Sequence, residues 1–460
     1  MKINRLIVAA VVIGAQFYTP YIRAAETPNI DALLQRIDEL EQKVKVLERN
    51  REVDQEISTE KSKGGPSVVL GSNGLVVRSA DTNFVMNIHG YAQTDGRFYL
   101  NDRNTVNDTF LLRRVRPIIE GTVYEKFDYR LMLDIATGNV TGSSAANNAL
   151  IDDAYVNAKF FKQFQVQVGK YKSPVGLERL KSTADLIFVE TGFATQLTPN
   201  YDTGVEIHND LFNSPINYAI GIFNGAADAA SDDLDTVDQG KDIAGRIFAQ
   251  PFLNTDKEAL RGLGFGVGGS MGRHQGTLPS YRTPGQQTFF SYATTTTADG
   301  TQYRIDPQFY YYWGPFGILG EYILSSQKVR SSVAGNRPAR FDNTAWQVEA
   351  SYFITGEQNS FKTISPLHPF GPANGGWGAL EIAARVEQLS LDKDAFPNYA
   401  PATSAKEATS WGVGVNWYLN RNVKVNLDYE QTSFRGGSKA KTAVTARPES
   451  VILSRVQFAF

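Results

Sequence analysis

The final segment of the chain, ILSRVQFAF (residues 452–460), alternates strictly between two kinds of side chain. Val456 and Phe458 fall on one face of an extended segment, whereas Arg455 and Gln457 fall on the other. Successive side chains of a β-strand point to opposite faces, so the pattern predicts a strand with one apolar and one mixed face. Such a strand ending in an aromatic residue is typical of a transmembrane antiparallel β-barrel, whose apolar face meets lipid.

The same two-residue period recurs in residues 346–355, 411–419 and 423–430. A soluble β-sandwich alternates as well, so a single strand of this kind would decide little. From residue 83 onward the chain can be divided into about sixteen strand-like segments, a number within the range of outer-membrane barrels. The fold class we predict is therefore all-β, a transmembrane barrel formed by residues 80–460.

The connections between these segments are of two kinds. Short ones are fringed with aromatic residues, as in 124–127 and 313–316, and long ones are polar, as in 172–200 and 275–302. Outer-membrane barrels have short periplasmic turns and long outer loops, and aromatic rings mark their membrane interfaces. The connection 356–376 departs from this rule, because it is long on the side where short turns are expected.

Residues 1–24 resemble a cleavable signal peptide. Lys2 and Arg5 precede an apolar stretch at 6–15, and Ala24 provides a small residue at the expected cleavage site. Ten apolar residues are too few for a membrane-spanning helix, which needs about 20. The sequence thus predicts export to the outer membrane of a Gram-negative cell and insertion through strands.

A short coiled-coil helix is expected at residues 27–50, in the periplasm. Apolar residues recur there at steps of three and four, from Ile30 to Leu47, with charged residues between them. A single amphipathic helix lying on a neighbour is the alternative. Isolated coils of this pattern favour dimers, whereas a three-fold barrel would impose a trimer, and the sequence leaves that open. Residues 51–79 are expected to be a linker.

Composition limits the function. The net charge is −2, so nothing attracts nucleic acid or anions to the chain as a whole, and any charge selectivity must be local. The absence of cysteine fits a protein that crosses an oxidising periplasm, and it would fit many cytosolic proteins as well. The four histidines are scattered, which argues against a metal site, and we expect no cofactor. We do not expect an enzyme.

Several blocks of the sequence resemble the phosphate-selective porin O and P family. The likeness covers about residues 80–460 and implies a sixteen-stranded trimeric barrel of the outer membrane, with anion transport in its best-known members. The blocks are FLLRRVRP (110–117), VGKYKSP (168–174), GLE (176–178), GIFNG (221–225), GEY (320–322), ITGE (354–357) and GVNWY (414–418).

This resemblance also implies candidate pore residues. Arg113 and Arg114 match a pair of arginines at the family's constriction, Arg179 follows the Gly-Leu-Glu block, and Asp152 matches an acidic residue opening the strand after the second outer loop. Two departures weaken phosphate selectivity. Tyr91 replaces a constriction arginine, and residues 278–284 carry one arginine where the family has a closely spaced series.

The residues themselves support a related interpretation. Neighbours on a regular strand point to opposite faces, so Arg113 and Arg114 can share the lumen only at a β-bulge or outside the membrane core. A lipid-facing arginine at mid-membrane costs about 2–4 kcal/mol. Arginines in the lumen either attract anions or pair with carboxylates across the wall, for which Glu120, Asp134 and Asp152 are the candidates.

Two long connections bear on the pore. Loop 172–200 carries Lys172, Arg179 and Lys181 together with many apolar residues, and we predict that it folds into the barrel. Lys181 therefore joins the candidate anion-binding residues. Loop 225–241 carries five aspartates, for which a solvated acidic loop is a simpler interpretation than calcium binding.

The function predicted from the sequence is a passive, mildly anion-preferring diffusion channel of the phosphate type. Its expected partners are small anions such as phosphate, outer-membrane lipid and two further copies of the chain. One alternative is a general, non-selective porin. Another is a structural envelope protein that ties the outer membrane to peptidoglycan through the coiled coil.

Overall fold

A computed structural model of the chain contains two compact units, Met1–Gly65 and Pro66–Phe460. In the first unit the described residues 40–45 and 47–49 are helical. The signal peptide and the rest of the expected coiled coil lie outside the described residues. No helix in the described part of the chain is long and apolar enough to cross a membrane. The structure describes residues 40–45, 47–49, 65–100, 106–136, 151–209, 214–232, 240–335, 337–362, 364–371, 373, 375–440 and 443–460.

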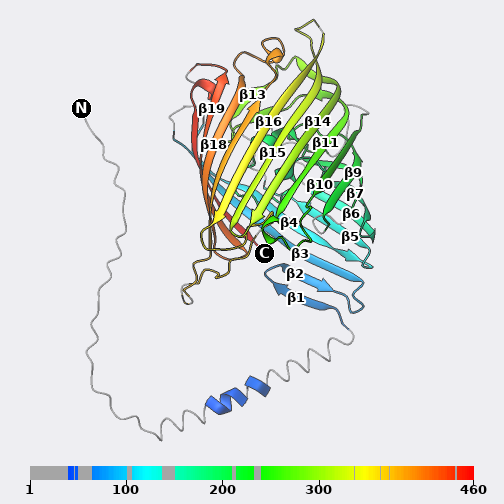
Figure 1. The fold of residues 1–460 in the computed structure, drawn as a ribbon, viewed down its shortest axis with the longest axis vertical. Coiled ribbons are helices and arrows are strands. Elements are labelled where there is room, and N and C mark those ends of the chain that lie inside the picture. The colour runs from blue at the N-terminus through cyan, green and yellow to red at the C-terminus, as the bar shows by residue number, and fades with distance from the viewer. Residues whose placement is uncertain are drawn as a thin grey trace, which may run out of the picture. The chain divides into compact units, whose positions relative to one another are not determined.

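Sixteen strands of the described residues form a closed antiparallel barrel, as the alternation predicted (Figure 1). They are β3 (Phe84–Tyr99), β4 (Thr109–Val123), β5 (Phe127–Leu133), β6 (Ile151–Phe161), β7 (Phe164–Lys172), β8 (Tyr201–His208), β9 (Ile216–Phe223), β10 (Asp242–Ala249), β11 (Leu263–Thr277), β14 (Thr296–Trp313), β15 (Phe316–Ser331), β16 (Pro338–Phe353), β17 (Ala379–Ser390), β18 (Ala405–Tyr418), β19 (Val423–Gly436) and β20 (Glu449–Ala459).

The last strand closes the barrel. β20 pairs with β19 on one side and with β3 on the other, and the Phe460 N–H donates to the Gly90 carbonyl oxygen at 3.0 Å. Its side chains alternate as expected. Val456 and Phe458 are 54% and 52% exposed on the outer wall, whereas Arg455 is 2% exposed inside. An apolar outer wall and a polar inner wall are what a barrel in lipid requires.

Part of the expected linker 51–79 is a hairpin, made of β1 (Ser67–Gly71) and β2 (Gly74–Arg78). β2 also pairs with β3 beyond the point where β20 ends, so the hairpin extends the sheet at the turn side (Figure 1). Gly74 takes φ +87°, a conformation that glycine adopts without strain. The strands were not predicted because their consecutive valines lack the two-residue period.

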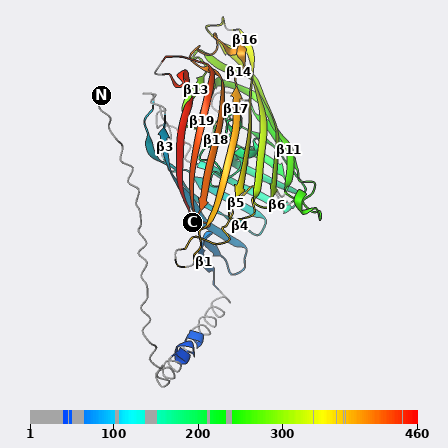
Figure 2. The ribbon, with the colours of Figure 1, turned by 60° about the vertical axis from the view of Figure 1, so that its left-hand side comes forward.

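Most of the long loops gather at the opposite end from the C-terminus, as both views show (Figures 1 and 2), whereas the long connection between β16 and β17 lies on the turn side, as expected for 356–376. Loop 278–295 contains the hairpin β12 (Ser280–Arg282) and β13 (Thr288–Ser291), and β11 and β14 extend further than the expected loop 275–302 allowed. The remaining short elements are α2 (Leu177–Leu180), η1 (Phe193–Leu197), η2 (Glu258–Leu260), η3 (Lys393–Ala395) and η4 (Val444–Ala446).

The outer half of the lumen is filled by loops around an apolar core. Val175, Phe193 and Leu197 of loop 173–200 pack there with Tyr281 and Phe290 of the β12–β13 hairpin. Ile323 and Leu389, from the inner face of the wall, belong to the same cluster. The pore is consequently narrowed by folded chain, and its path is set by how these loops are held.

Candidate functional site

Loop 173–200 is held against the far wall by buried carboxylates. Its backbone N–H groups donate to acidic side chains of β15, β17 and β19, so these donors of the loop are paired although they are buried. The pairs are Leu177 N with Glu321 Oε2, Phe193 N with Glu387 Oε2 and Val189 N with Asp428 Oδ2, each at 2.6 Å. The prediction that this loop folds into the barrel is confirmed.

The folded loop lies between two cavities. An outer cavity of about 480 Å³ is bordered by β4, the loop and segments 228–230 and 279–286 of the outer loops. An inner cavity of about 300 Å³ lies toward the turn side, among β5 to β10. Both are lined by Arg116, Lys172, Thr183 and Tyr201. Solute passing from one cavity to the other must therefore move past these four side chains.

A β-bulge brings Arg113 and Arg114 to the same side of β4. Gln93 of β3 pairs with Arg114, and the next residue, Thr94, pairs with Leu112, so Arg113 is the extra residue. Both arginines line the outer cavity. The bulge is one of the two solutions that strand geometry allowed, and it avoids placing a guanidinium in lipid.

Four arginines converge on one carboxylate of the loop, Glu190. Arg113 donates to both of its oxygens, at 2.6 and 3.1 Å. Arg97, Arg114 and Arg455 have a guanidinium nitrogen 3.2, 3.9 and 4.0 Å from a Glu190 oxygen. Burial acts to raise the pKa of Glu190, but the arginines, Arg113 foremost, lower it below its ordinary value. Glu190 is therefore a carboxylate that neutralises part of the cluster.

Arg116 is the centre of a second cluster, at the junction of the cavities. It pairs with Asp134 at 3.0 Å and with Asp152 at 2.6 Å, and it donates to the Tyr91 hydroxyl at 3.0 Å. Asp152 thus lies behind Arg116 and lines neither cavity. Tyr91, which the resemblance aligned with an arginine, also bonds Thr183 of the loop at 2.6 Å.

Other cations at the outer cavity are held by neutral acceptors. Arg179 donates to Thr198, Asn200 and the Thr195 carbonyl, at 3.1, 3.2 and 2.5 Å. Burial lowers its pKa. The Lys172 ammonium donates to the Lys181 carbonyl at 2.6 Å. Within the described residues, neither Arg179 nor Lys172 has a carboxylate oxygen within 4.0 Å, so no carboxylate there competes with an anion for these two side chains.

Lys181 and Arg282 complete the basic lining of the outer cavity. The Lys181 nitrogen is 3.9 Å from Glu349 and 5.4 Å from the ring centre of Phe361. Arg282 is the single arginine of the 278–284 stretch, and its backbone is tied to loop 173–200 through Gln196. In all, seven basic and three acidic side chains line this cavity, which leaves an excess of positive charge.

We predicted that loop 225–241 is a solvated acidic loop, but the structure contradicts this prediction at Asp228. Asp228 is buried and accepts from Arg304, Gln302 and Ser325, at 2.7, 2.9 and 2.8 Å. Residues 233–239 lie outside the described residues, with three of the five aspartates. Asp228 is buried because a fully buried arginine of β14 lies opposite it, and pairing across strands does not show in a single segment of sequence.

The structure thus brings together four of the five candidate residues, namely Arg113, Arg114, Arg179 and Lys181, at one cavity. The partner of the arginines, Glu190, was not singled out from the sequence. A carboxylate in a loop rich in apolar residues was the available signal, since such a group needs cations if the loop is buried.

Comparison with known proteins agrees with this architecture. Residues 86–460 match the model of a family described as phosphate-selective porin O and P. Porin O of Pseudomonas aeruginosa is 23% identical over 405 residues, which cover 80% of this chain and 87% of Porin O.

Solved structures show the same fold. OmpT of Vibrio cholerae superposes with a TM-score of 0.51 and 14% identity, over 82% of this chain and 98% of that one. The outer membrane channel DcaP of Acinetobacter baumannii gives 0.50 and 10%, over 82% and 98%. Since the family match spans most of the chain, this protein belongs to the phosphate-selective porin O and P family and is an outer-membrane porin, a passive diffusion channel.

Proposed function

We propose that the channel prefers small anions mildly over cations and admits phosphate. The observation that supports this proposal is the outer cavity, whose lining has seven basic side chains against three acidic ones. Arg113, Arg114, Arg179 and Lys181 are the residues we propose to attract the anion. Asp152 acts indirectly, by holding Arg116 in place.

The preference is mild for two reasons. Glu190 neutralises part of the positive charge of Arg113 and Arg114, and Tyr91 contributes a hydroxyl where the family has a further arginine. The remaining excess still matters, because charges in a narrow channel with low-dielectric walls act more strongly than charges screened by salt over about 8–10 Å outside.

The test is a reversal potential measured in planar bilayers across a potassium chloride gradient, followed by block of the chloride current by phosphate. We expect a reversal potential on the anion side. Arg179→Gln should move it toward zero and weaken phosphate block. The matched control is Arg261→Gln, because Arg261 is exposed in a turn and donates to a carbonyl there.

Cation preference in the wild-type channel, or an Arg179→Gln channel with unaltered selectivity, would contradict the proposal. That outcome would favour the second candidate, a general non-selective porin. The observation behind this candidate is the convergence of arginines on Glu190, which would then be purely structural.

For assembly, we propose a homotrimer in outer-membrane lipid, with a signal peptide at 1–24 and a periplasmic coiled coil at 27–50 that contacts peptidoglycan. Support comes from the apolar outer wall and the heptad pattern. The alternative of a mainly structural envelope protein shares this arrangement. Neither a cofactor nor catalytic activity is part of the proposal.

A further inference from the structure

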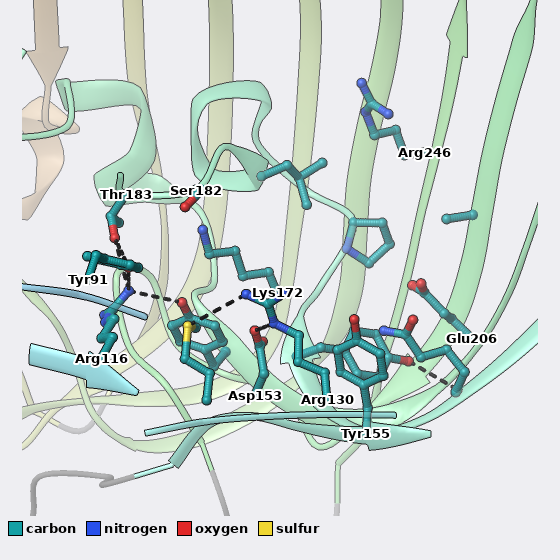
Figure 3. A pocket seen from close by; sticks show the side chains of 17 residues that line it. Tyr91, Arg116, Arg130, Asp153, Tyr155, Lys172, Ser182, Thr183, Glu206 and Arg246 are labelled. Atoms are coloured by element: carbon teal, nitrogen blue, oxygen red, sulfur yellow. Dashed lines mark hydrogen bonds and ion pairs between the residues drawn. The ribbon is translucent and has the colours of Figure 1, made fainter. Parts of the chain in front are cut away.

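The inner cavity differs in chemistry from the outer one. It is lined by the hydroxyl-bearing rings of Tyr91, Tyr155, Tyr171 and Tyr201, and by apolar side chains that include Met132, Leu180 and Ala219 (Figure 3). Rings with a polar tip and an apolar body suit a solute that is itself amphipathic. Inorganic phosphate has no apolar surface to place against such a lining.

Arg246 of β10, like Lys172 at the junction of the two cavities, is a cation without a carboxylate partner among the described residues. Its Nε donates to the Gln308 side chain at 2.8 Å, and its guanidinium lies 4.4 Å from the ring centre of Phe248. Arg116 and Arg130, by contrast, each pair with two carboxylates. In the described part of the chain no acidic oxygen lies within 4.0 Å of Arg246, so it can bind an anionic group.

Glu206 of β8 lines the same cavity and lacks a partner. The residue is 6% exposed, and its Oε2 makes no hydrogen bond within the described residues. Buried polar atoms are almost always hydrogen-bonded, and leaving one unpaired costs about 1–3 kcal/mol. This oxygen has almost no accessible surface, so the carboxylate must rotate to turn it toward the cavity that Glu206 lines, where a ligand with a hydroxyl or amine donor would satisfy it.

The strand register places these two side chains around one hollow. Glu206 pairs with Gly221, which pairs with Ala244, and Arg246 lies two residues beyond Ala244 on the same face. With about 4.8 Å between strands and 3.3 Å per residue, their Cα atoms are about 12 Å apart. On the intervening strand β9, Ala219 pairs with Arg246 and lines the cavity with a small side chain. Figure 3 shows Glu206 and Arg246 on the same side of the cavity.

We propose that the inner cavity binds small organic acids that combine a carboxylate, an apolar ring and a hydrogen-bond donor. Arg246 binds the carboxylate, the tyrosines contact the ring, and Glu206 accepts from the donor. This site deepens the proposed function, since such a solute must first pass the outer cavity, but it uses different residues. It makes hydroxylated aromatic acids a substrate class of this channel.

The test uses the purified full-length protein in planar bilayers. Block of the chloride current is measured with 4-hydroxybenzoate, benzoate, acetate and inorganic phosphate. We expect the half-blocking concentration of 4-hydroxybenzoate to be about tenfold lower than that of acetate, with benzoate between them.

Variants locate the site. Arg246→Gln should raise the half-blocking concentration of both aromatic acids relative to that of phosphate, and Glu206→Leu should abolish the difference between 4-hydroxybenzoate and benzoate. Ala219→Leu keeps every charge but fills the hollow, so it should weaken aromatic block alone. Arg261→Gln is the control, and heat-modifiable migration in gels identifies folded protein. If Arg246→Gln does not fold, aromatic block in Ala219→Leu alone tests the inner site.

Equal block by acetate and the aromatic acids would overturn the inner site, as would aromatic block unaffected by Arg246→Gln or by Ala219→Leu. In either case phosphate block and its loss in Arg179→Gln would still support the outer cavity. Conversely, absent phosphate block with strong aromatic block would contradict the proposed phosphate passage and leave the inner site standing.

Discussion

The arginines of the pore illustrate how far single residues can be predicted. Two adjacent arginines cannot both face the lumen of a regular strand, which left either a bulge or a position outside the membrane core, and the structure has the bulge, at Arg113. The meeting of Arg97, Arg113 and Arg455 at Glu190 could not be predicted. These side chains come from β3, β4 and β20, and only the register of the closed barrel brings them together.

Replacing the shared carboxylate should reveal its electrostatic role. In Glu190→Gln the arginines lose their counter-charge, so anion preference should increase, and the folded protein should lose about 3 kcal/mol, the cost of breaking a buried pair. Reversal potentials and denaturation midpoints in detergent measure the two effects. Unchanged selectivity would mean that these arginines do not act on permeating ions.

The same residue predicts a pH dependence. In the folded protein the arginines lower the pKa of Glu190 against the effect of burial. In the unfolded chain the pKa of a glutamate is about 4.3. A lowered folded-state pKa contributes stability above pH about 4.3, which is lost as the pH falls toward the folded-state value. Wild type should lose more stability than Glu190→Gln between pH 5 and strongly acidic pH, as denaturation midpoints at each pH would show.

Variants of Tyr91 test whether the lack of an arginine at this position weakens phosphate binding. Tyr91→Arg places a guanidinium beside Arg116, close to Asp134 and Asp152, and should strengthen phosphate block. Tyr91→Phe is the control. It should lose only the hydroxyl's hydrogen bonds, worth about 1 kcal/mol each, and leave the charge unchanged. Weaker phosphate block in the arginine variant would argue against a binding site at this position.

At the level of elements, prediction succeeded where one strand carries its own signal. The alternation in β20 identified its two faces, and apolar residues in loop 173–200 indicated burial. It failed for β1 and β2, whose consecutive valines have no period, and for Asp228, whose burial depends on Arg304 of another strand. Contacts between distant elements were not predictable from either alone.

The anchors of loop 173–200 should control the width of the pore. Glu387 is fully buried and accepts from the Phe193 N–H, so Glu387→Ala leaves that donor unpaired at a cost of about 1–3 kcal/mol. The loop should loosen, with higher single-channel conductance and more current noise. Asp394→Ala, at an exposed position in η3, is the matched control. Identical conductance in both variants would mean that the loop does not limit flow.

For the whole molecule, local charge matters more than net charge. The chain carries −2 overall, yet the outer cavity has an excess of basic side chains, because carboxylates are used elsewhere to hold the loops. Net charge therefore could not predict selectivity. The placement of acids behind the loop and arginines at the cavity became visible only in the folded chain.

The division of the chain into two units leads to a last prediction. Every barrel hydrogen bond we describe lies within Pro66–Phe460, so the pore itself should not need the first unit. Deleting residues 27–65 should leave unitary conductance and ion preference unchanged in planar bilayers. If the heptads at 27–50 hold three subunits together, conductance steps that occur in threes in the full-length protein should become single steps. Altered unitary conductance would instead mean that the N-terminal segment enters the pore.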